Sequence, residues 1–278
     1  MYFQTLENTS LTQLTDLFNA AFADYFVKVK LTPEHLEEKM YSEDIDLKIS
    51  MGIFDNEKPV GFMLHGLREI DGKKVAYNAG TGVVKEYRGQ NATEKMYEKL
   101  NPILKSKGIS EVILEVISQN AAAIRSYEKA GFTKVAGLAC FKGDVKVPTP
   151  NEQIEVKELE NIDLEKVRDF SDWQATWQHS EATIRKMEDL IFQGAFLKNE
   201  LVGFLIGQKS RARVYQFAVD HEYRMKGIGQ ALFYAFAQSM KSEISVINVD
   251  DPSGNSQQFL RKIGLTSFLS QDEMKLKL

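Results

Sequence analysis

The chain has 278 residues, of which 43% are hydrophobic, enough for about two globular domains. Its formal net charge of −4, without a dense basic stripe, argues against nucleic-acid binding. There is no long apolar run and no signal-peptide pattern, and the single cysteine, Cys140, fits a reducing compartment. We therefore expect a cytoplasmic protein without nucleic-acid or membrane partners. The oligomeric state stays open.

The first half of the chain predicts alternating strands and helices. A strand is expected at 2–7, helices at 10–22 and 32–41, and strands at 47–55, 59–69 and 74–84. Next come an amphipathic helix at 92–107, an apolar strand at 111–117, a helix at 120–130 and a hairpin at 132–144. Asn120 is a good N-cap for the last of these helices, and Gly131 is a good residue to follow it.

The second half predicts the same order of elements. Strands are expected at 153–158, 190–198, 201–209 and 212–220, then a helix at 228–241, a strand at 244–249, a helix ending at 263 and a final hairpin. Trp173 and Trp177 are four residues apart, so they would share a helix face if that segment is helical. Core packing is the expected role, and an acceptor-pocket wall is the alternative. The pattern predicts an α/β (α+β) fold with a mixed sheet and helices on both faces.

Three segments of the first half recur in the same order in the second. GIFDNEKPVGFML (52–64) aligns without a gap with GAFLKNELVGFLI (194–206), and each reads as a β-hairpin. Glu-Tyr-Arg (86–88) recurs at 222–224, and SYEKAGF (126–132) aligns with FLRKIGL (259–265). The halves are therefore interpreted as two copies of one domain. The two prolines between residues 146 and 152 favour an extended connector, which predicts domains 1–146 and 152–278.

A glycine-containing turn precedes one helix of each copy. In the second copy it reads Arg224-Met225-Lys226-Gly227-Ile228-Gly229, after a strand and before an amphipathic helix. Free N–H groups at a helix start bind phosphate, and glycines let that backbone approach a pyrophosphate closely. A tight turn that only leads into the helix is the alternative interpretation. The equivalent turn of the first copy reads Arg88-Gly89-Gln90-Asn91-Ala92-Thr93.

Together these motifs resemble the GCN5-related N-acetyltransferase (GNAT) family. R-x-x-G-x-G is similar to its acetyl-CoA pyrophosphate loop, and NAAAIRSYEKAGF (120–132) is similar to the segment N-x-x-A-I-x-x-Y-E-K-x-G-F. The resemblance covers most of both halves and implies two tandem GNAT domains, acetyl-CoA as co-substrate and an amine acceptor, either a small molecule or a peptide. It implies these cofactor-binding residues: Gly82, Val83, Val84, Arg88, Gly89, Gln90, Asn91, Ala92, Thr93, Asn120, Arg224, Lys226, Gly227, Ile228 and Gly229.

The turn of the first copy departs from the family pattern, because Asn91 and Thr93 occupy the usual glycine or alanine positions. Backbone N–H groups bind the phosphate and are present in every non-proline residue, and asparagine tolerates left-handed geometry. We therefore expect this turn to be altered but usable. No metal site is expected, since His35, His65, His179 and His221 lack metal-ligand spacing.

Acetyl transfer to an amine needs a base for the amine proton and an acid for the departing thiolate. Tyr127 occupies the position of the family's tyrosine acid. Glu115 interrupts the apolar strand EVILEVI, where desolvation would raise its pKa and suit a general base. The arrangement is similar to the family branch that acetylates the N-terminal amine of a ribosomal protein. In the alternatives, Tyr127 only packs a helix onto the sheet and Glu115 only faces water.

The second copy has different residues at these positions. Asn248 aligns with Glu115, Leu260 with Tyr127 and Ser253 with Asn120. The sequence therefore predicts that the first copy is catalytic and that the second is degenerate. Two alternatives stay open: the second copy is the active one, with a base such as Asp250 or Asp251, or the chain is a non-catalytic CoA-binding or structural protein. Asp24, Tyr25 and Phe26 lie where the family builds its acceptor site.

Overall fold

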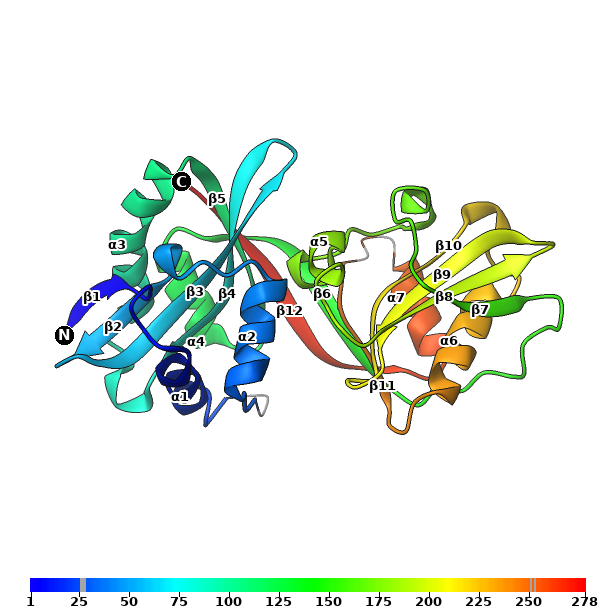
Figure 1. Ribbon diagram of the computed structural model, residues 1–278, viewed down its shortest axis with the longest axis horizontal. Coiled ribbons are helices and arrows are strands. Elements are labelled where there is room, and N and C mark those ends of the chain that lie inside the picture. Colours follow the sequence, from blue (N-terminus) through cyan, green and yellow to red (C-terminus); the bar gives the residue numbers. More distant parts are fainter. Residues whose placement is uncertain (26–28, 251, 253) are drawn as a thin grey trace. The chain divides into compact units, whose positions relative to one another are not determined.

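The computed structural model describes residues 1–25, 29–250, 252 and 254–278. The chain forms two compact units, which are shown in Figure 1. Unit 1 comprises Met1–Ala136 together with Asp272–Leu278, and unit 2 comprises Gly137–Gln271. Each unit contains a mixed sheet with helices on both faces, so the expected fold class is confirmed.

The sheet of unit 1 has the strand order β1-β2-β3-β4-β5-β12. Its strands are β1 (Tyr2–Thr5), β2 (Met51–Asp55), β3 (Lys58–Ile70), β4 (Lys73–Val83), β5 (Ile109–Ile117) and the end of β12 (Thr266–Lys277). Its helices are α1 (Leu11–Ala21), α2 (Pro33–Ser42), α3 (Ala92–Ser106) and α4 (Ala121–Lys129). Neighbouring strands from β1 to β4 pair antiparallel, whereas β4 and β5 are parallel.

Alternation along β3 explains why helices cover both faces of this sheet. Phe62 and Leu64 join a buried cluster with residues of α1 and α2, whereas Met63 between them joins the cluster that contains residues of α3 and α4. Successive side chains of a strand point to opposite faces, so a continuous apolar run supplies two cores at once. Each core lies against one pair of helices.

The sheet of unit 2 has the order β6-β11-β10-β9-β8-β7. Its strands are β6 (Thr133–Gly143, from Gly137 onward), β7 (Glu155–Leu159), β8 (Leu190–Leu197), β9 (Glu200–Gln208), β10 (Arg213–Val219) and β11 (Ile244–Val249). Its helices are α5 (Glu181–Ile184), α6 (Ile228–Gln238) and α7 (Asn255–Lys262). Residues of α6 and α7 share one buried cluster, and residues of α5 belong to another.

The hairpins expected from the repeat are confirmed. Strands β2 and β3 pair antiparallel around Asn56 and Glu57, and β8 and β9 pair around Lys198 and Asn199. Both central residues of each turn have positive φ, between 47° and 69°. Two successive left-handed residues match the twist of a tight two-residue hairpin turn.

The hairpins expected at the end of each copy are wrong. Residues 133–143 form the single strand β6, and residues 266–277 form the single strand β12. Each strand continues from one compact unit into the other, at 136/137 and at 271/272. The compact units therefore differ from the expected ranges 1–146 and 152–278. A strand extends wherever a partner strand offers hydrogen bonds, and here the partners lie far along the chain.

One smaller expectation also fails. Residues 47–49 form a 3₁₀ turn rather than the start of a strand, because the Asp46 carboxylate accepts a hydrogen bond from the Lys48 amide at 2.8 Å. Trp173 and Trp177 share no helix. Trp177 begins the 3₁₀ turn Trp177–His179, and Trp173 lies outside any helix, 6.2 Å from the Phe217 ring. Both tryptophans contribute to packing in unit 2, as expected for a core role.

Candidate active site

The parallel strands β4 and β5 of unit 1 separate partway along their length. Their paired positions extend from Lys74 opposite Ile109 to Tyr77 opposite Ile113, among the residues that the structure describes. A bulge in β4 between Asn78 and Gly80 follows immediately after this point. The later residues of β4 and of β5 therefore flank an opening in the sheet. Glu115 and Tyr77 lie beside it, on β5 and β4.

Glu115 is half-buried and accepts a hydrogen bond from the Tyr77 hydroxyl. Burial raises the pKa of the Glu115 carboxyl to about 8, the Tyr77 hydrogen bond opposes the rise, and the carboxylates of Glu273 and Glu43 add to it. A desolvated carboxylate holds its proton more tightly, and so does one beside other negative charges. Glu115 can therefore exchange a proton near neutral pH, which an ordinary surface glutamate does not.

Tyr127 projects from α4, and its side chain is 9% exposed. Its ring packs edge-on against Phe132 at a centroid distance of 5.6 Å. Burial raises the pKa of the Tyr127 hydroxyl to about 12, and a hydrogen bond with Thr81 opposes the rise. The phenol is therefore neutral and carries a proton at physiological pH. Thr81 belongs to β4, so the Tyr127 hydroxyl reaches the strand that flanks the opening.

A buried polar network holds Thr81 in place. The Asn78 side-chain amide donates to the Thr81 hydroxyl and to the Tyr97 hydroxyl, both at 2.8 Å. The Tyr97 hydroxyl lies 3.2 Å from Nε2 of His65, which burial keeps neutral by lowering its pKa to about 3. Hydrogen bonds between buried side chains restrict their positions. This network therefore orients the residue that contacts the Tyr127 hydroxyl.

Tyr25 and Asn120 complete this side of the opening. The Asn120 side chain accepts a hydrogen bond from the Ala123 amide at 3.1 Å and so caps α4, as expected. Burial raises the pKa of the Tyr25 hydroxyl, while a hydrogen bond with the Asn120 side chain opposes the rise. Negative charge on Tyr25 would raise the pKa of Tyr127, which places the two hydroxyls in one neighbourhood. Phe26 lies outside the described residues.

The turn before α3 has the geometry of a phosphate-binding helix start. Asn91, the N-cap residue, has φ 53° and ψ 36°, and Gly89 has φ 79°, so both are left-handed. No side chain caps the helix start at Asn91. The first N–H groups of a helix lack intrahelical acceptors and carry the positive end of the helix dipole. Asparagine thus adopts the conformation that the altered turn requires.

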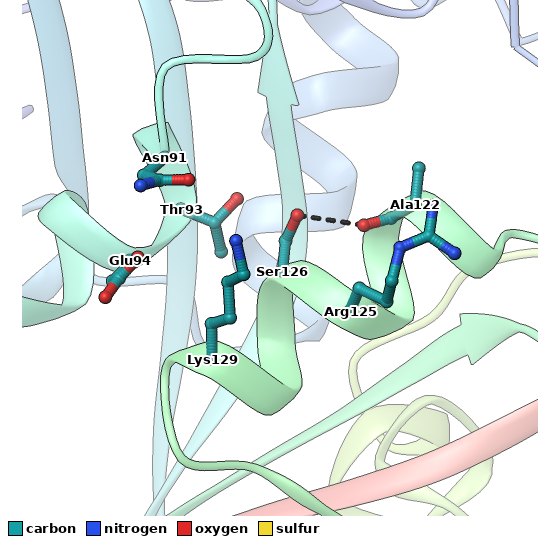
Figure 2. A pocket seen from close by; sticks show the side chains of 7 residues that line it. All are labelled: Asn91, Thr93, Glu94, Ala122, Arg125, Ser126 and Lys129. Carbon is teal, nitrogen blue, oxygen red and sulfur yellow. Dashed lines mark hydrogen bonds between the residues drawn. The ribbon is translucent and has the colours of Figure 1, made fainter.

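A pocket of about 170 Å³ lies between this helix start and α4. Figure 2 shows Thr93 and Lys129, from the two helices, facing each other across it. The lining residues are Asn91, Thr93, Glu94, Ala122, Arg125, Ser126 and Lys129. Two cationic side chains beside a helix N-terminus make an environment that favours a polyanion.

Arg88 faces away from this helix start. Its guanidinium donates to Asp24 at 2.9 and 2.7 Å, to the Ala21 carbonyl at 2.9 Å and to the Val83 carbonyl at 2.9 Å. The Val84 amide donates to the Val60 carbonyl of β3 at 2.9 Å. The hydrogen bonds of Arg88 and of the Val84 amide are therefore made within the protein. Arg88 thus anchors the turn to the end of α1, a role that the sequence pattern did not predict.

Unit 2 repeats this anchoring. Arg224 donates to Asp172 at 2.6 Å, to the Phe170 carbonyl at 2.8 Å and to the Val219 carbonyl at 3.1 Å. Gly227, the N-cap of α6, is left-handed with φ 88°. Lys226 donates to the Glu222 carbonyl at 3.0 Å. Arg224 and Lys226 thus bond to the protein itself.

The second helix pair is packed differently. A Cβ added to Gly229 would meet the Phe259 ring at 2.9 Å, so glycine is required where α6 and α7 approach. At the aligned positions, unit 1 has Thr93 where unit 2 has Gly229, and Ser126 where unit 2 has Phe259. Both Thr93 and Ser126 line the polar pocket. Where unit 2 has a glycine on one helix and an aromatic side chain on the other, unit 1 has two small hydroxyl residues.

Unit 2 buries the residues that align with the proposed acid and base. Asn248 is 1% exposed and accepts a hydrogen bond from Gln271 at 2.5 Å. Leu260 is fully buried in the hydrophobic cluster of α6 and α7. Asp251 and Ser253 lie outside the described residues. The position of the carboxylate in unit 1 is thus occupied by a buried amide, and that of the phenol by a core leucine.

Comparison with known proteins decides the family. The model of the acetyltransferase (GNAT) family matches residues 12–132 and again residues 155–265. The chain belongs to the GNAT family. It therefore has the tandem arrangement that the sequence predicted, and acyl transfer is the chemistry of its family.

Solved GNAT structures share the fold. A tandem GNAT protein from the clavulanic acid biosynthesis pathway aligns over 99% of this chain and 98% of its own, with a TM-score of 0.75 and 11% identity. A GCN5-related N-acetyltransferase from Sphaerobacter thermophilus aligns over 99% and 95%, with a TM-score of 0.72 and 13% identity. Identities this low show the fold and nothing narrower.

One curated relative is similar in sequence over a shorter stretch. N-alpha-acetyltransferase 30 of Schizosaccharomyces pombe is 38% identical over 62 residues, which are 22% of this chain and 41% of that protein. Together with the family match, this supports an acetyltransferase. Among the described residues, no helix is long and apolar enough to cross a membrane, and no group of His, Cys, Asp and Glu side chains could hold a metal ion.

Sequence reasoning missed several residues of this GNAT site. Asn78 and Thr81 are polar residues in the buried and half-buried part of strand β4 after its two lysines, and this break in the pattern was a signal for them. Tyr77 and Tyr97 read as ordinary core aromatics, because their partners come from other elements. Glu273 gave no signal, since it lies at the far end of the chain.

Proposed function

We propose that unit 1 transfers an acetyl group from acetyl-CoA directly to a primary amine, with Glu115 as general base and Tyr127 as general acid. The observation that carries the proposal is the pairing of two groups at one opening in the sheet. One is a carboxylate whose pKa is about 8, and the other is a protonated phenol whose pKa is about 12. Two groups whose environments give them different pKa values suit the roles of general base and general acid.

The residues present fit acetyl-CoA. Its diphosphate needs anion donors, and the start of α3 offers main-chain amides beside the Thr93 hydroxyl. Arg125 and Lys129 would compensate further phosphate charge in the adjoining pocket. Val84 and Gly82 direct their backbone groups to β3, so the Val83 amide and the Thr81 backbone groups point away from β3, because backbone groups alternate along an antiparallel ladder. The Val83 carbonyl is bound by Arg88.

Acetyl-CoA supplies the acetyl group as a thioester. The amine nitrogen forms the new bond to the carbonyl carbon, and the carbon–sulfur bond breaks. Glu115 takes the proton that the amine loses, and Tyr127 gives its phenolic proton to the departing sulfur. Thr81 positions the Tyr127 hydroxyl, and the Tyr77 hydroxyl positions the Glu115 carboxylate. Both catalytic groups return to their starting states by exchange with solvent.

The acceptor is proposed to be a primary amine of a small molecule or peptide. The similarity to N-alpha-acetyltransferase 30 supports testing peptides with a free N-terminal amine first. The acidic side chains near the opening, Glu43 and Glu273 with Glu115, favour an acceptor that arrives as a cation.

The test is release of CoA thiol with a panel of amines and peptides. Tyr127→Phe should slow release by about 10²-fold or more, because it removes the donated proton. Tyr2→Phe is the matched control: Tyr2 is an exposed tyrosine stacked on Phe54 at the sheet edge, and its loss should leave the rate unchanged. An unchanged rate in Tyr127→Phe would reject the acid role.

A second candidate is that unit 2 binds CoA, favoured by the left-handed Gly227 at the start of α6. Its buried Leu260 and Asn248 favour binding without turnover. Calorimetry with CoA distinguishes the two cases: one site per chain fits binding at unit 1, and two sites fit binding at both. Bulky substitutions of Gly227 and Gly229 that leave turnover intact would rule out catalysis by unit 2.

A further inference from the structure

The last strand of the chain lies beside the strand that carries Glu115. In Figure 1 the C-terminal end of β12, drawn in red, lies beside β5. The Leu278 amide donates to the Ser110 carbonyl at 3.0 Å, and the Ser118 hydroxyl donates to Asp272 at 2.7 Å. These contacts at the two ends show that the strands run antiparallel. Counting inward from the hydrogen-bonded pair Leu278 and Ser110 brings Glu273 opposite Glu115.

The pleat of the two strands places both carboxylates on the same face of the sheet. Asp272, Met274 and Leu276 of β12 are buried, whereas Glu273 and Lys275 between them are half-buried. On β5, Glu111 and Glu115 alternate in the same way with buried residues. Lys275 lies 3.2 Å from Glu111, which confirms that these two alternating sets share a face. Glu111 thus faces a cation on β12, whereas Glu115 faces an anion.

The titratable groups that act on Glu115 come from three elements. Tyr77 of β4 donates a hydrogen bond to it, and the pair Lys39 and Glu43 of α2 acts on it through space. Glu43 is bound to Lys39 at 2.6 Å, so much of its charge is compensated locally. Glu273 of β12 supplies the other negative charge, across from Glu115 on the neighbouring strand.

We propose that Glu273, carried by the C-terminal strand, is a positioning residue for the reaction of unit 1, where it sets how tightly Glu115 binds a proton. The inference rests on the proposed function of Glu115 as base. Two neighbouring carboxylates disfavour ionisation of both, so each makes the other the better proton acceptor. A residue in the sequence of the second copy thereby tunes the base of the first.

The first test is the pH dependence of kcat/KM in Glu273→Gln. Removing the negative charge lowers the pKa of Glu115, so the base form persists at lower pH and the acid limb of the profile moves to lower pH. Each unit of downward movement raises the ionised fraction at pH 6.5 about tenfold, so activity there relative to the plateau should rise at least about twofold. The plateau rate should fall, since a weaker base accepts the amine proton less readily.

Two matched variants define the effect. Glu111→Gln removes a carboxylate that lies on the same face of β5 as Glu115 but is paired with Lys275. This variant should leave the acid limb of the profile in place. Glu273→Asp keeps the charge and should keep most of the raised pKa. Equal shifts in Glu111→Gln and Glu273→Gln would overturn the proposal, because the effect would then reflect net charge alone.

The second test does not depend on activity. Carboxyl carbon NMR of labelled glutamate follows the titration of Glu115 directly, with Glu115→Gln assigning the signal. The proposal expects a lower midpoint in Glu273→Gln than in the native chain, and an unchanged midpoint overturns it. Full activity in Glu115→Gln would instead overturn the proposed function, and the NMR result would still stand, so the two failures are distinguishable.

Discussion

The two units carry the same glycine-containing turn on the same arginine anchor, yet only one has a glutamate and a tyrosine beside it. Arg88 and Arg224 each bond to a carboxylate and to two backbone carbonyls in an equivalent arrangement. Beyond this shared frame, unit 1 has Glu115 and Tyr127, whereas unit 2 has the buried Asn248 and Leu260. The comparison teaches that the arginine holds the turn in place in both units, and that the motif alone does not identify a catalytic copy.

The exchange of glycine for threonine shows how the pair diverged structurally. In unit 2 the Phe259 ring packs against Gly229, and the ring also lies 5.5 Å from Phe233 and 6.0 Å from Phe217. In unit 1 the same interface holds two hydroxyl residues beside a polar pocket. In unit 2 this region is thus filled by apolar side chains, whereas in unit 1 it contains a polar pocket.

The largest expected difference between the units concerns the aligned residues Glu115 and Asn248. Glu115→Gln should lower kcat/KM by about 10²–10⁴-fold, because the amine proton loses its acceptor. Asn248→Ala in unit 2 should leave kcat/KM within about twofold and should lower the free energy of unfolding, since Gln271 loses its partner. Steady-state thiol release and urea unfolding measure the two effects. Equal losses of activity in both variants would break the comparison.

The same Glu115→Gln variant has a pH-dependent effect on stability. The folded-state pKa of about 8 exceeds the ordinary value of 4.5, so the folded protein binds the extra proton between these pH values. Stability contributed by the protonated carboxyl is complete below pH 4.5 and is lost as the pH rises through 8. The Tm of Glu115→Gln relative to the native chain should therefore rise between about pH 5 and about pH 9 in thermal unfolding scans. A constant difference would show that Glu115 titrates normally.

A smaller effect is expected at the aligned positions Thr93 and Gly229. Gly229→Thr should destabilise the protein by roughly 1–3 kcal/mol, because the new side chain overlaps the Phe259 ring. Adding Phe259→Ser to that variant should recover part of the loss by recreating the pair found in unit 1. Thr93→Gly should reduce CoA affinity in calorimetry with little change in stability. If Gly229→Thr is neutral, the packing difference does not separate the units.

The smallest effect is expected at the first left-handed residue of each turn. Met225 has φ 60°, and its counterpart Gly89 has φ 79° in open space, where an added Cβ would meet no atom within 4 Å. Left-handed backbone costs a non-glycine residue about 1 kcal/mol, so Met225→Gly should stabilise the protein by about that amount and Gly89→Ala should destabilise it similarly. Urea unfolding measures both. Changes of the same sign would show that contacts, rather than backbone strain, dominate there.

Much of the site was predictable because its signals are local. The β2–β3 and β8–β9 hairpins, the left-handed Asn91 and the Asn120 cap follow from short-range rules of turn and cap geometry. Glu115 was visible as a charge in an apolar strand, and its raised pKa follows from that burial.

Other features depended on residues distant in sequence. We expected the arginine of the turn to bind a phosphate. In each unit it binds instead a carboxylate and backbone carbonyls at the end of the first helical region. The contact between Thr81 and Tyr127 could not be predicted from the sequence, because it depends on how α4 packs against β4.

The sequence alone determined that the chain repeats one domain twice, which copy has a glutamate and a tyrosine at the aligned positions, and where most elements begin and end, because these depend on patterns within short windows. Only the tertiary structure decided that β6 and β12 each continue from one unit into the other, that Arg88 is an anchor and that Glu273 lies beside Glu115. A strand's alternation shows which side chains share a face, but it does not identify the neighbouring strand. That choice is made by hydrogen bonding and apolar burial between segments far apart in the chain.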